Sequence, residues 1–283
     1  MTKNPMQRSS ASVLVDSRPV HYHLTGSDDD QRPLLVMVHG STGSTDSHYG
    51  FLFPMLGFRQ RVVSVDLAAP AEGQTLSLEQ LVAQVAAVVD QVSPGRAISL
   101  MGYSLGAVVA AALAAQRPQQ VTQLILVAGW MKTDAHQQLR NGVWRELRQE
   151  GVAAIRNYML YCAFSADFIT ARTPAELAGM AEKIGLDAFV DQQMELNANI
   201  DISALVPQIR ATTLVVGCTH DQMVPKHHSL QLLGAIDDAR YTQIDSGHAV
   251  VFERPAELLR LIDVFLRDPK AHAAGSIIPA ARP

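Results

Sequence analysis

A serine, a histidine and an aspartate stand in this sequence where they can act together as nucleophile, base and acid. The serine is the centre of Gly102-Tyr103-Ser104-Leu105-Gly106, a G-x-S-x-G pentapeptide between an apolar run and an alanine-rich run. A buried strand that turns directly into a helix at a serine forces strained backbone angles, and the glycines remove side chains that would collide there. The hydroxyl is then exposed at the top of a sheet, above the positive end of the helix. Ser104 is the candidate nucleophile.

A serine hydroxyl is unreactive at neutral pH and needs a base within hydrogen-bond reach. Of the ten histidines, His248 is the best candidate, because it lies in a Ser-Gly-His sequence after the last expected strand and before the last expected helix. A lone loop histidine is usually a solvated surface residue. This one is expected at the same carboxyl edge of the sheet as Ser104, which favours a role as the base.

The base in turn needs an acid that fixes its tautomer and stabilises the imidazolium. Asp221 follows an expected strand and is the first candidate, although it could instead, or in addition, cap the helix that Pro225 opens. Asp134, beyond the sixth strand, is the second candidate. The neighbouring histidines match no metal-binding spacing and are expected to be exposed or to support the site, namely His220, His227 and His228.

Negative charge develops on the carbonyl oxygen during attack, and fixed hydrogen-bond donors must stabilise it. The backbone amide of Leu105, at the start of the helix, is one expected donor. The other is expected from the loop His39-Gly40-Ser41-Thr42-Gly43, where Ser41 is the chosen residue. His39 is expected to hold this loop by hydrogen bonding rather than to act as a second base.

The elements that must position these residues alternate between short β-rich runs and helical runs, which is typical of a mainly parallel sheet with helices on both faces. Eight strands are expected, at residues 12–16, 19–24, 34–39, 62–66, 97–101, 123–127, 213–216 and 241–244. The first two form an expected hairpin, whereas 34–38 is continuously apolar, as in a strand covered on both faces. Apolar spacing predicts a covering helix over 78–92.

Between Trp130 and Pro207 the alternation stops, and about four helical segments follow, each with apolar residues three, four or seven apart. In the first of them, Leu139, Val143 and Leu147 form the apolar face. Such an insertion after strand six predicts a helical cap over the carboxyl edge of the sheet, where open α/β sheets bind ligands. The cap aromatics are expected mainly to pack and in part to line a pocket, namely Trp144, Tyr158, Tyr161, Phe164, Phe168 and Phe189.

These elements predict one large α/β domain with an inserted cap. Its core is expected at 12–129 and 207–267, the cap at 130–206, and a flexible C-terminal tail at 268–283. Apolar residues of the cap are also suited to a homodimer contact.

Composition narrows the functional classes. The 283 residues are 48% hydrophobic and carry 23 basic and 27 acidic side chains, a net charge of −4 without a basic run, which argues against nucleic acid as a partner. The first twelve residues are polar, and no stretch is long and apolar enough to span a membrane. The only cysteines, Cys162 and Cys218, form neither a disulfide framework nor a metal-binding spacing. A soluble cytoplasmic protein without a membrane partner is expected.

Together the motifs H-G-S-T-G, G-Y-S-L-G, G-C-T-H-D-Q-M-V-P and S-G-H, in this order, resemble α/β-hydrolase-fold enzymes of the compact bacterial esterase, thioesterase and lactonase kind. The resemblance covers about Ser12 to Arg267. It implies a triad of Ser104, Asp221 and His248, an oxyanion hole of Ser41 and Leu105, and no cofactor or metal. Two loops depart from the family pattern, at 67–73 and before the acid, and both bear on substrate shape.

The expected function is hydrolysis of a small or medium carboxylic ester, thioester or lactone through an acyl-enzyme, with a small-molecule acyl substrate beneath the cap. A serine nucleophile differs from the aspartate that epoxide hydrolases and haloalkane dehalogenases of this fold use. Two alternatives stay open. One is a lyase, cyclase or carbon–carbon bond hydrolase with the same triad, and the other is a ligand sensor that has kept the fold without turnover.

Overall fold

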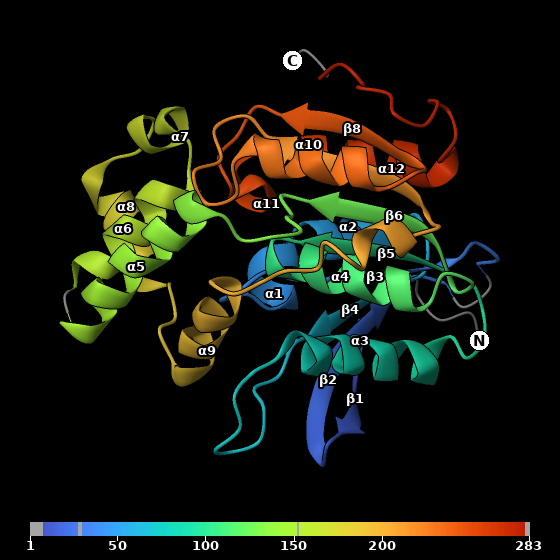
Figure 1. Cartoon of the computed structure of the whole chain (residues 1–283), viewed down its shortest axis with the longest axis horizontal. Coiled ribbons are helices and arrows are strands. Elements are labelled where there is room, and N and C mark those ends of the chain that lie inside the picture. Colours follow the sequence, from blue (N-terminus) through green and yellow to red (C-terminus); the bar gives the residue numbers. More distant parts are fainter. Residues whose placement is uncertain (1–7, 28–29, 152, 281–283) are drawn as a thin grey trace.

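The computed structural model describes residues 8–27, 30–151 and 153–280 (Figure 1). These residues form an eight-stranded sheet with the order β1-β2-β4-β3-β5-β6-β7-β8. The β1–β2 and β2–β4 pairs are antiparallel, and the remaining pairs are parallel. The strands are β1 (Ser9–Val15), β2 (Arg18–Thr25), β3 (Leu34–Val38), β4 (Val62–Asp66), β5 (Ile98–Tyr103), β6 (Val121–Val127), β7 (Thr212–Cys218) and β8 (Ala239–Ile244). The predicted fold class is confirmed, and each predicted strand differs only at its ends.

Helices cover both faces of the sheet. The first face packs against α3 (Leu78–Val92), α4 (Leu105–Gln116) and α10 (Lys226–Ala235). The second packs against α1 (Thr45–Tyr49), α2 (Leu52–Gly57) and α12 (Pro255–Arg267), with the short helix α11 (Val250–Glu253) before α12. Because β3 and β5 lie in the middle, every residue of both strands is buried, which explains the continuously apolar sequence of β3.

The alanine-rich helix α4 lies closest to the sheet. All its residues from Leu105 to Ala115 are buried. Small side chains allow this close approach, and because the helix is covered all round it has no polar face. Its N-terminus is therefore held firmly against the end of β5, where Ser104 lies.

After β6 the described residues form five cap helices, one more than the sequence predicts. They are α5 (Ala135–Gln149), α6 (Ala154–Ala163), α7 (Ala166–Thr170), α8 (Pro174–Glu182) and α9 (Ala188–Asn197). The additional helix, α7, spans only five residues, too few to show an apolar period in the sequence. Figure 1 shows α5 to α8 grouped on the side to which the arrowheads of β6 and β8 point, so the cap covers the carboxyl edge of the sheet.

The side of α5 that points to the interior differs from the prediction. Leu139 is 72% exposed and Val143 is 38% exposed, whereas Gln137, Asn141 and Trp144 are buried. The helix therefore presents a face with two amides to the interior. The reason is that this face borders a cavity rather than a close-packed core, so polar side chains meet open space there and the rule that apolar residues point inward does not apply.

The segment expected to be a flexible tail is instead bound along β8, the edge strand. The amide of Gly275 donates to Ala239 O (2.7 Å), that of Tyr241 to Ser276 O (2.9 Å), and that of Ile278 to Tyr241 O (2.7 Å). An edge strand leaves backbone groups unpaired on its outer side, and the segment satisfies them. These bonds use the backbone, so the sequence carries no period for them. Residues 281–283 of the predicted tail lie outside the described residues.

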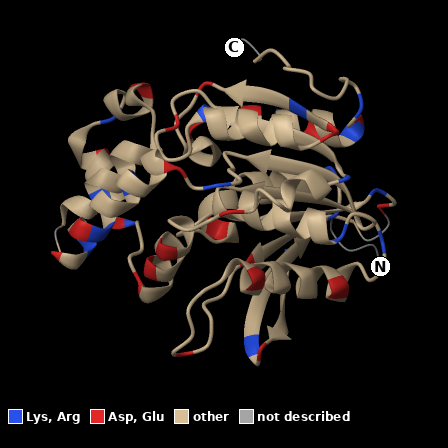
Figure 2. Ribbon diagram, viewed as in Figure 1, with Lys and Arg blue, Asp and Glu red and all other residues tan. Residues whose placement is uncertain are grey.

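Charged side chains of both signs are distributed over the surface. Figure 2 shows basic and acidic residues interspersed on the cap and on the helices of the core in this view. No described helix combines the length and the apolar character required to cross a bilayer.

Candidate active site

Ser104 occupies a strained turn between β5 and α4, as the pentapeptide predicts. Its backbone angles are φ 56° and ψ −124°, in a region that residues with a side chain rarely adopt. A methyl group added at Gly102 would lie 2.1 Å from Gly106 O, and one added at Gly106 would lie 2.1 Å from Val38 O. Only glycine fits at both positions, and the close packing they allow holds the Ser104 hydroxyl at the edge of the sheet.

The structure brings Ser104, His248 and Asp221 into one hydrogen-bonded chain. His248 Nε2 lies 2.8 Å from Ser104 Oγ, and His248 Nδ1 lies 2.7 Å from Asp221 Oδ2. A carboxylate only accepts hydrogen bonds, so Nδ1 carries the proton and Nε2 is free to accept from the serine hydroxyl. The Asp221 side chain is fully buried and His248 is 5% exposed, which keeps water from competing for these bonds.

Of the two roles considered for Asp221, the structure shows its carboxylate beside His248, whereas the helix-cap prediction is wrong, because α10 begins at Lys226 with Pro225 as its N-cap and without a side-chain capping bond. While Oδ2 faces His248, Oδ1 accepts hydrogen bonds from the backbone amides of Met223 (2.8 Å) and Val224 (2.7 Å). These bonds stabilise the turn before α10 and, at the same time, fix the carboxylate in the orientation that His248 requires.

Tyr103 is a supporting residue that the sequence did not reveal. Its phenol donates a hydrogen bond to the backbone carbonyl of His248 (3.0 Å), and its ring lies beside the imidazole at 5.5 Å between centroids. Burial raises the pKa of Tyr103 well above its usual value, so the hydroxyl stays protonated and keeps donating. Its position in the pentapeptide, directly before the nucleophile, is the signal that could have pointed to it.

The loop expected to supply an oxyanion donor is fixed by His39, as predicted. The amide of Leu67 donates to His39 Nε2 (3.0 Å), so Nδ1 carries the proton and donates to Gly40 O (2.8 Å). Burial lowers the pKa of His39, which keeps the imidazole neutral. Gly40 packs so closely that a methyl group there would lie 2.9 Å from Ser104 Cβ.

Ser41 and Leu105 lie at the two places expected for oxyanion donors, on this loop and at the start of α4. Neither backbone amide donates to an acceptor within the described ranges. The Ser41 side chain is held by Asn197, whose Nδ2 donates to Ser41 Oγ (2.9 Å) from the cap helix α9. Both amides therefore have no acceptor among the described residues.

A cavity of about 420 Å³ lies between the sheet edge and the cap. Ser104 and His248 form part of its wall, and the cap contributes mainly apolar side chains, namely Met159, Leu160, Phe164, Met180, Ile184 and Met194. Of the six cap aromatics only Phe164 is in this lining, while Trp144 packs in a small core within the cap. The volume suits a small or medium organic molecule.

The sequence did not reveal the polar residues of the cavity wall. They include His48, Gln137, Arg140, Asn141, Lys183 and Asn197. Gln137, Asn141 and Trp144 are spaced four and three residues apart, a helical period that marks the inner face of α5 in hindsight. His48 is neutral like the amides of the set, because burial lowers its pKa to about 3.

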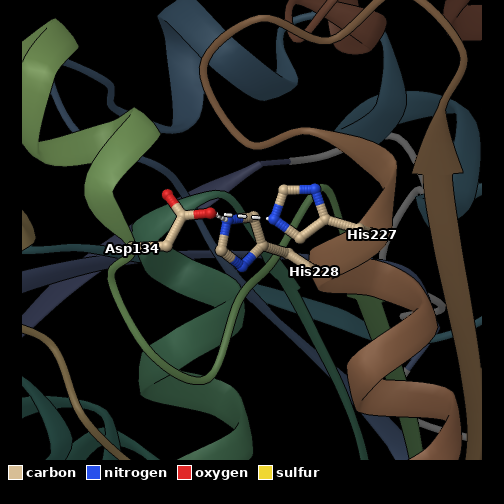
Figure 3. Close-up of side chains that lie close together, drawn as sticks. All are labelled: Asp134, His227 and His228. Carbon is tan, nitrogen blue, oxygen red and sulfur yellow. Dashed lines mark hydrogen bonds and ion pairs between the residues drawn. The ribbon is translucent and has the colours of Figure 1, made fainter.

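Asp134, the second candidate for the acid, faces His227 and His228 (Figure 3) and forms no hydrogen bond with His248 among the described residues. Its Oδ2 is 2.9 Å from His227 Nε2 and 3.3 Å from His228 Nε2. Asp134 also caps α5, while both histidines belong to the first turn of α10, so the cluster links cap and core. It does not contribute to the described cavity lining, which leaves Asp221 as the partner of His248.

Among the described residues, these three form a group whose side-chain nitrogen and oxygen atoms could bind a metal ion together, because these atoms lie within 4.8 Å of one another. Two imidazoles and one carboxylate match the ligands that zinc takes. In this structure, however, Asp134 and His227 already hydrogen bond to each other. Because the cluster lies outside the cavity lining, an ion there would link α5 to α10 and would not contact a substrate.

The chain is similar in sequence to known hydrolases. The model of the Alpha/beta hydrolase family matches residues 35–261. A "Pyrrolizixenacetamide deacetylase" of Xenorhabdus hominickii is 31% identical over 249 residues, which cover 84% of this chain and 92% of that protein. A "Putative carbamate hydrolase RutD" of Rhizobium rhizogenes is 28% identical over 262 residues, covering 88% and 98%.

Solved structures share the fold. An enol-lactonase from Burkholderia xenovorans superposes with a TM-score of 0.77 at 22% identity, covering 91% of this chain and 100% of that one. An alpha/beta hydrolase enzyme named MGS-M2, from a deep-sea metagenome library, gives a TM-score of 0.81 at 18% identity, covering 91% and 98%. At these identities the likeness extends to the fold alone.

Proposed function

The chain belongs to the alpha/beta hydrolase family, and from that premise we propose that it is a serine hydrolase cleaving a small or medium carboxylic ester, thioester or lactone through an acyl-enzyme intermediate. The observation that carries the proposal is the chain of hydrogen bonds from Ser104 through His248 to Asp221, at 2.8 and 2.7 Å, in the wall of a cavity. A buried acid, an oriented base and a hydroxyl in this order are the components that acyl transfer needs.

In the first half of the proposed reaction, Ser104 Oγ attacks the carbonyl carbon while His248 Nε2 takes the hydroxyl proton. Asp221 stabilises the imidazolium that forms. The carbonyl oxygen becomes an oxyanion and is bound by the amides of Ser41 and Leu105. His248 then gives the proton to the leaving oxygen or sulfur, the bond to it breaks, and an acyl group remains on Ser104.

In the second half, a water molecule replaces the leaving group. His248 removes a proton from the water as it attacks the acyl carbon, and the same two amides bind the second oxyanion. Collapse of this intermediate returns the proton to Ser104 and releases a carboxylic acid. The cap helices narrow access to the cavity, which supports a small or medium acyl compound rather than a polymer.

The relative of highest identity named above supports a second candidate bond. It is called a deacetylase of an acetamide, and the RutD proteins are called putative carbamate hydrolases. The same acyl-enzyme route cleaves an amide when His248 protonates a leaving nitrogen. Amides and carbamates therefore belong in the substrate panel beside esters, thioesters and lactones.

The test combines hydrolysis with covalent labelling. We expect Ser104→Ala to lower kcat about 10⁴-fold or more on any accepted substrate while the protein stays folded by thermal unfolding. A fluorophosphonate should add once to the wild type, by intact mass, and not to the variant. Near-wild-type turnover by Ser104→Ala would end the proposal, and absence of labelling would favour a sensor. Product analysis separates hydrolysis from lyase, cyclase and carbon–carbon cleavage.

A further inference from the structure

The lysine and arginine side chains in the described lining of the Ser104 cavity face no acidic side chain of that lining. Among the described residues of its lining, Arg140 and Lys183 are cationic, and no aspartate or glutamate is present. The outer surface of the cap, by contrast, carries both signs (Figure 2). Lys183 follows α8 and is exposed, whereas Arg140 lies on α5, the helix that turns a polar face toward the cavity.

Arg140 is partly buried and forms no direct ion pair with a described residue, although the charge of Asp221 acts on it from a distance. Within the described ranges it forms no ion pair, and its Nε is buried without a hydrogen-bond partner. One Nη donates to Asn141 Oδ1, a neutral acceptor. Burial lowers the pKa of Arg140, although the group stays protonated at neutral pH. Because the carboxylate of Asp221 is bonded to His248, the partly desolvated guanidinium has no directly paired charge among the described residues, and this position favours an anion in the cavity.

Asn141 adds a second unsatisfied donor at the same place. The residue is 3% exposed and lines the cavity, and its Nδ2 has no partner among the described residues although its Oδ1 accepts from Arg140. Buried polar groups without partners are uncommon in folded proteins and need an explanation. Arg140 Nε and Asn141 Nδ2, on neighbouring residues, together offer donors to two oxygen atoms.

We propose that the substrate carries a carboxylate and that Arg140 and Asn141 bind it while the scissile carbonyl lies at Ser104. The proposal rests on the proposed function and names its substrate class, an acyl compound with a free acid. A carboxylate carries one negative charge, which a single guanidinium compensates, and its two oxygens match the guanidinium fork. A phosphate monoester carries close to two negative charges, which the single guanidinium at this position does not compensate.

Matched substrates test the preference. Mono-4-nitrophenyl adipate and suberate are compared with 4-nitrophenyl hexanoate and octanoate, which have the same chain lengths and end in a methyl group. For a carboxylate on the leaving side, 4-acetoxybenzoate is compared with 4-acetoxybenzamide. We expect the wild type to favour the anionic member of at least one pair about tenfold or more in kcat/KM. Preference for the neutral member in every pair overturns the proposal.

Variants assign the preference to its residue. Arg140→Gln should lower kcat/KM of the anionic substrate about 10- to 100-fold, mainly through KM, and leave the neutral one within about threefold. Arg140→Lys should restore part of the loss, because it keeps the charge without the fork. Arg145→Gln is the matched control, since Arg145 lies on the same helix but pairs with Glu195 at the surface. Equal losses on both substrates in Arg140→Gln would assign it a structural role and overturn the proposal.

A binding measurement separates this proposal from the proposed function. Calorimetry of mono-4-nitrophenyl suberate with Ser104→Ala should give a dissociation constant that rises about tenfold or more when Arg140→Gln is added. If the wild type hydrolyses no ester and this dependence holds, the proposed function fails and the carboxylate site stands. If hydrolysis depends on Ser104 but neither binding nor the kinetic preference depends on Arg140, the carboxylate site fails alone.

Discussion

The carboxylate of Glu253 accepts hydrogen bonds from both the amide (2.8 Å) and the hydroxyl (2.6 Å) of Ser165, and so joins the core helix α11 to the cap at the start of α7. The same carboxylate accepts from the amide of Gly247 (3.1 Å), the residue before His248. One side chain therefore sets both the position of the cap and the loop that carries the proposed base.

Removing this carboxylate should affect stability and turnover together. Glu253→Ala leaves three donors unsatisfied, and we expect a loss of about 2–4 kcal/mol in the free energy of unfolding. Because the His248 loop loses a support, kcat should also fall, by about tenfold. Urea unfolding and ester kinetics check the two effects. Glu257→Ala, on the next helix, is the control and should change neither by a comparable amount.

The two acid candidates can be told apart by amide substitution. Asp221→Asn should lower kcat about 10⁴-fold, because an amide beside His248 Nδ1 no longer fixes the proton on that nitrogen. Asp134→Asn removes the bond to His227 outside the cavity and should leave kcat within a few-fold. A large loss in Asp134→Asn with a small one in Asp221→Asn would reverse the assignment.

Glycine at the nucleophile turn should be irreplaceable. A methyl group at Gly106 would lie 2.1 Å from Val38 O and 2.5 Å from His39 O, so α4 must shift and Ser104 with it. We expect Gly106→Ala to cost about 3 kcal/mol or more in stability and most of the activity. Gly179→Ala is the matched control. Gly179 lies in α8 with nothing within 4 Å, and alanine there should stabilise by up to about 1 kcal/mol.

Acid sensitivity should arise in part from Asp66, which anchors α1 beside the Ser41 loop. Burial by itself raises the pKa of Asp66, but hydrogen bonds from the hydroxyl (2.7 Å) and amide (2.6 Å) of Thr45 outweigh it and hold the pKa below 3.8. The folded state thus binds the proton less tightly than the unfolded state. The stabilisation is complete above about pH 4 and is lost as the pH falls through the lowered pKa.

Denaturant unfolding between about pH 5 and pH 2 measures this contribution. The wild type should lose stability more steeply than Asp66→Asn, which has no proton to gain at that position. Thr45→Val keeps the amide bond and removes the hydroxyl, so its slope should lie between them. Identical slopes in the three proteins would show that Asp66 does not contribute.

The sequence predicted best the positions of residues that follow directly after a strand. Ser104, His248 and Asp221 each follow a strand, and parallel strands bring their carboxyl ends to one edge, so position along the chain was enough to place them together. It predicted less well which side chains face a cavity. The inner face of α5 is polar because it borders a cavity, and apolar periodicity therefore assigned Leu139 to the wrong side.

The pairing of the C-terminal segment could not be predicted from side-chain patterns, because backbone atoms form it. Residues 275–278 pair with β8 through backbone atoms, and the nearly buried Arg240 guanidinium donates to His272 O (2.9 Å). Ending the chain after Asp268 removes these partners and exposes the edge of the sheet. We expect a loss of about 2–4 kcal/mol in stability and concentration-dependent association, since an unpaired edge strand pairs with other copies.

Urea unfolding and light scattering over a range of protein concentrations measure the two effects. Ile277→Ala is the control, because Ile277 is 66% exposed and the segment is held mainly through its backbone. This substitution should cost less than about 0.5 kcal/mol. If it destabilises the protein as much as the truncation does, side-chain packing rather than backbone pairing binds the segment. If the truncated chain is as stable as the full one and associates no more than it does, the pairing contributes nothing in solution.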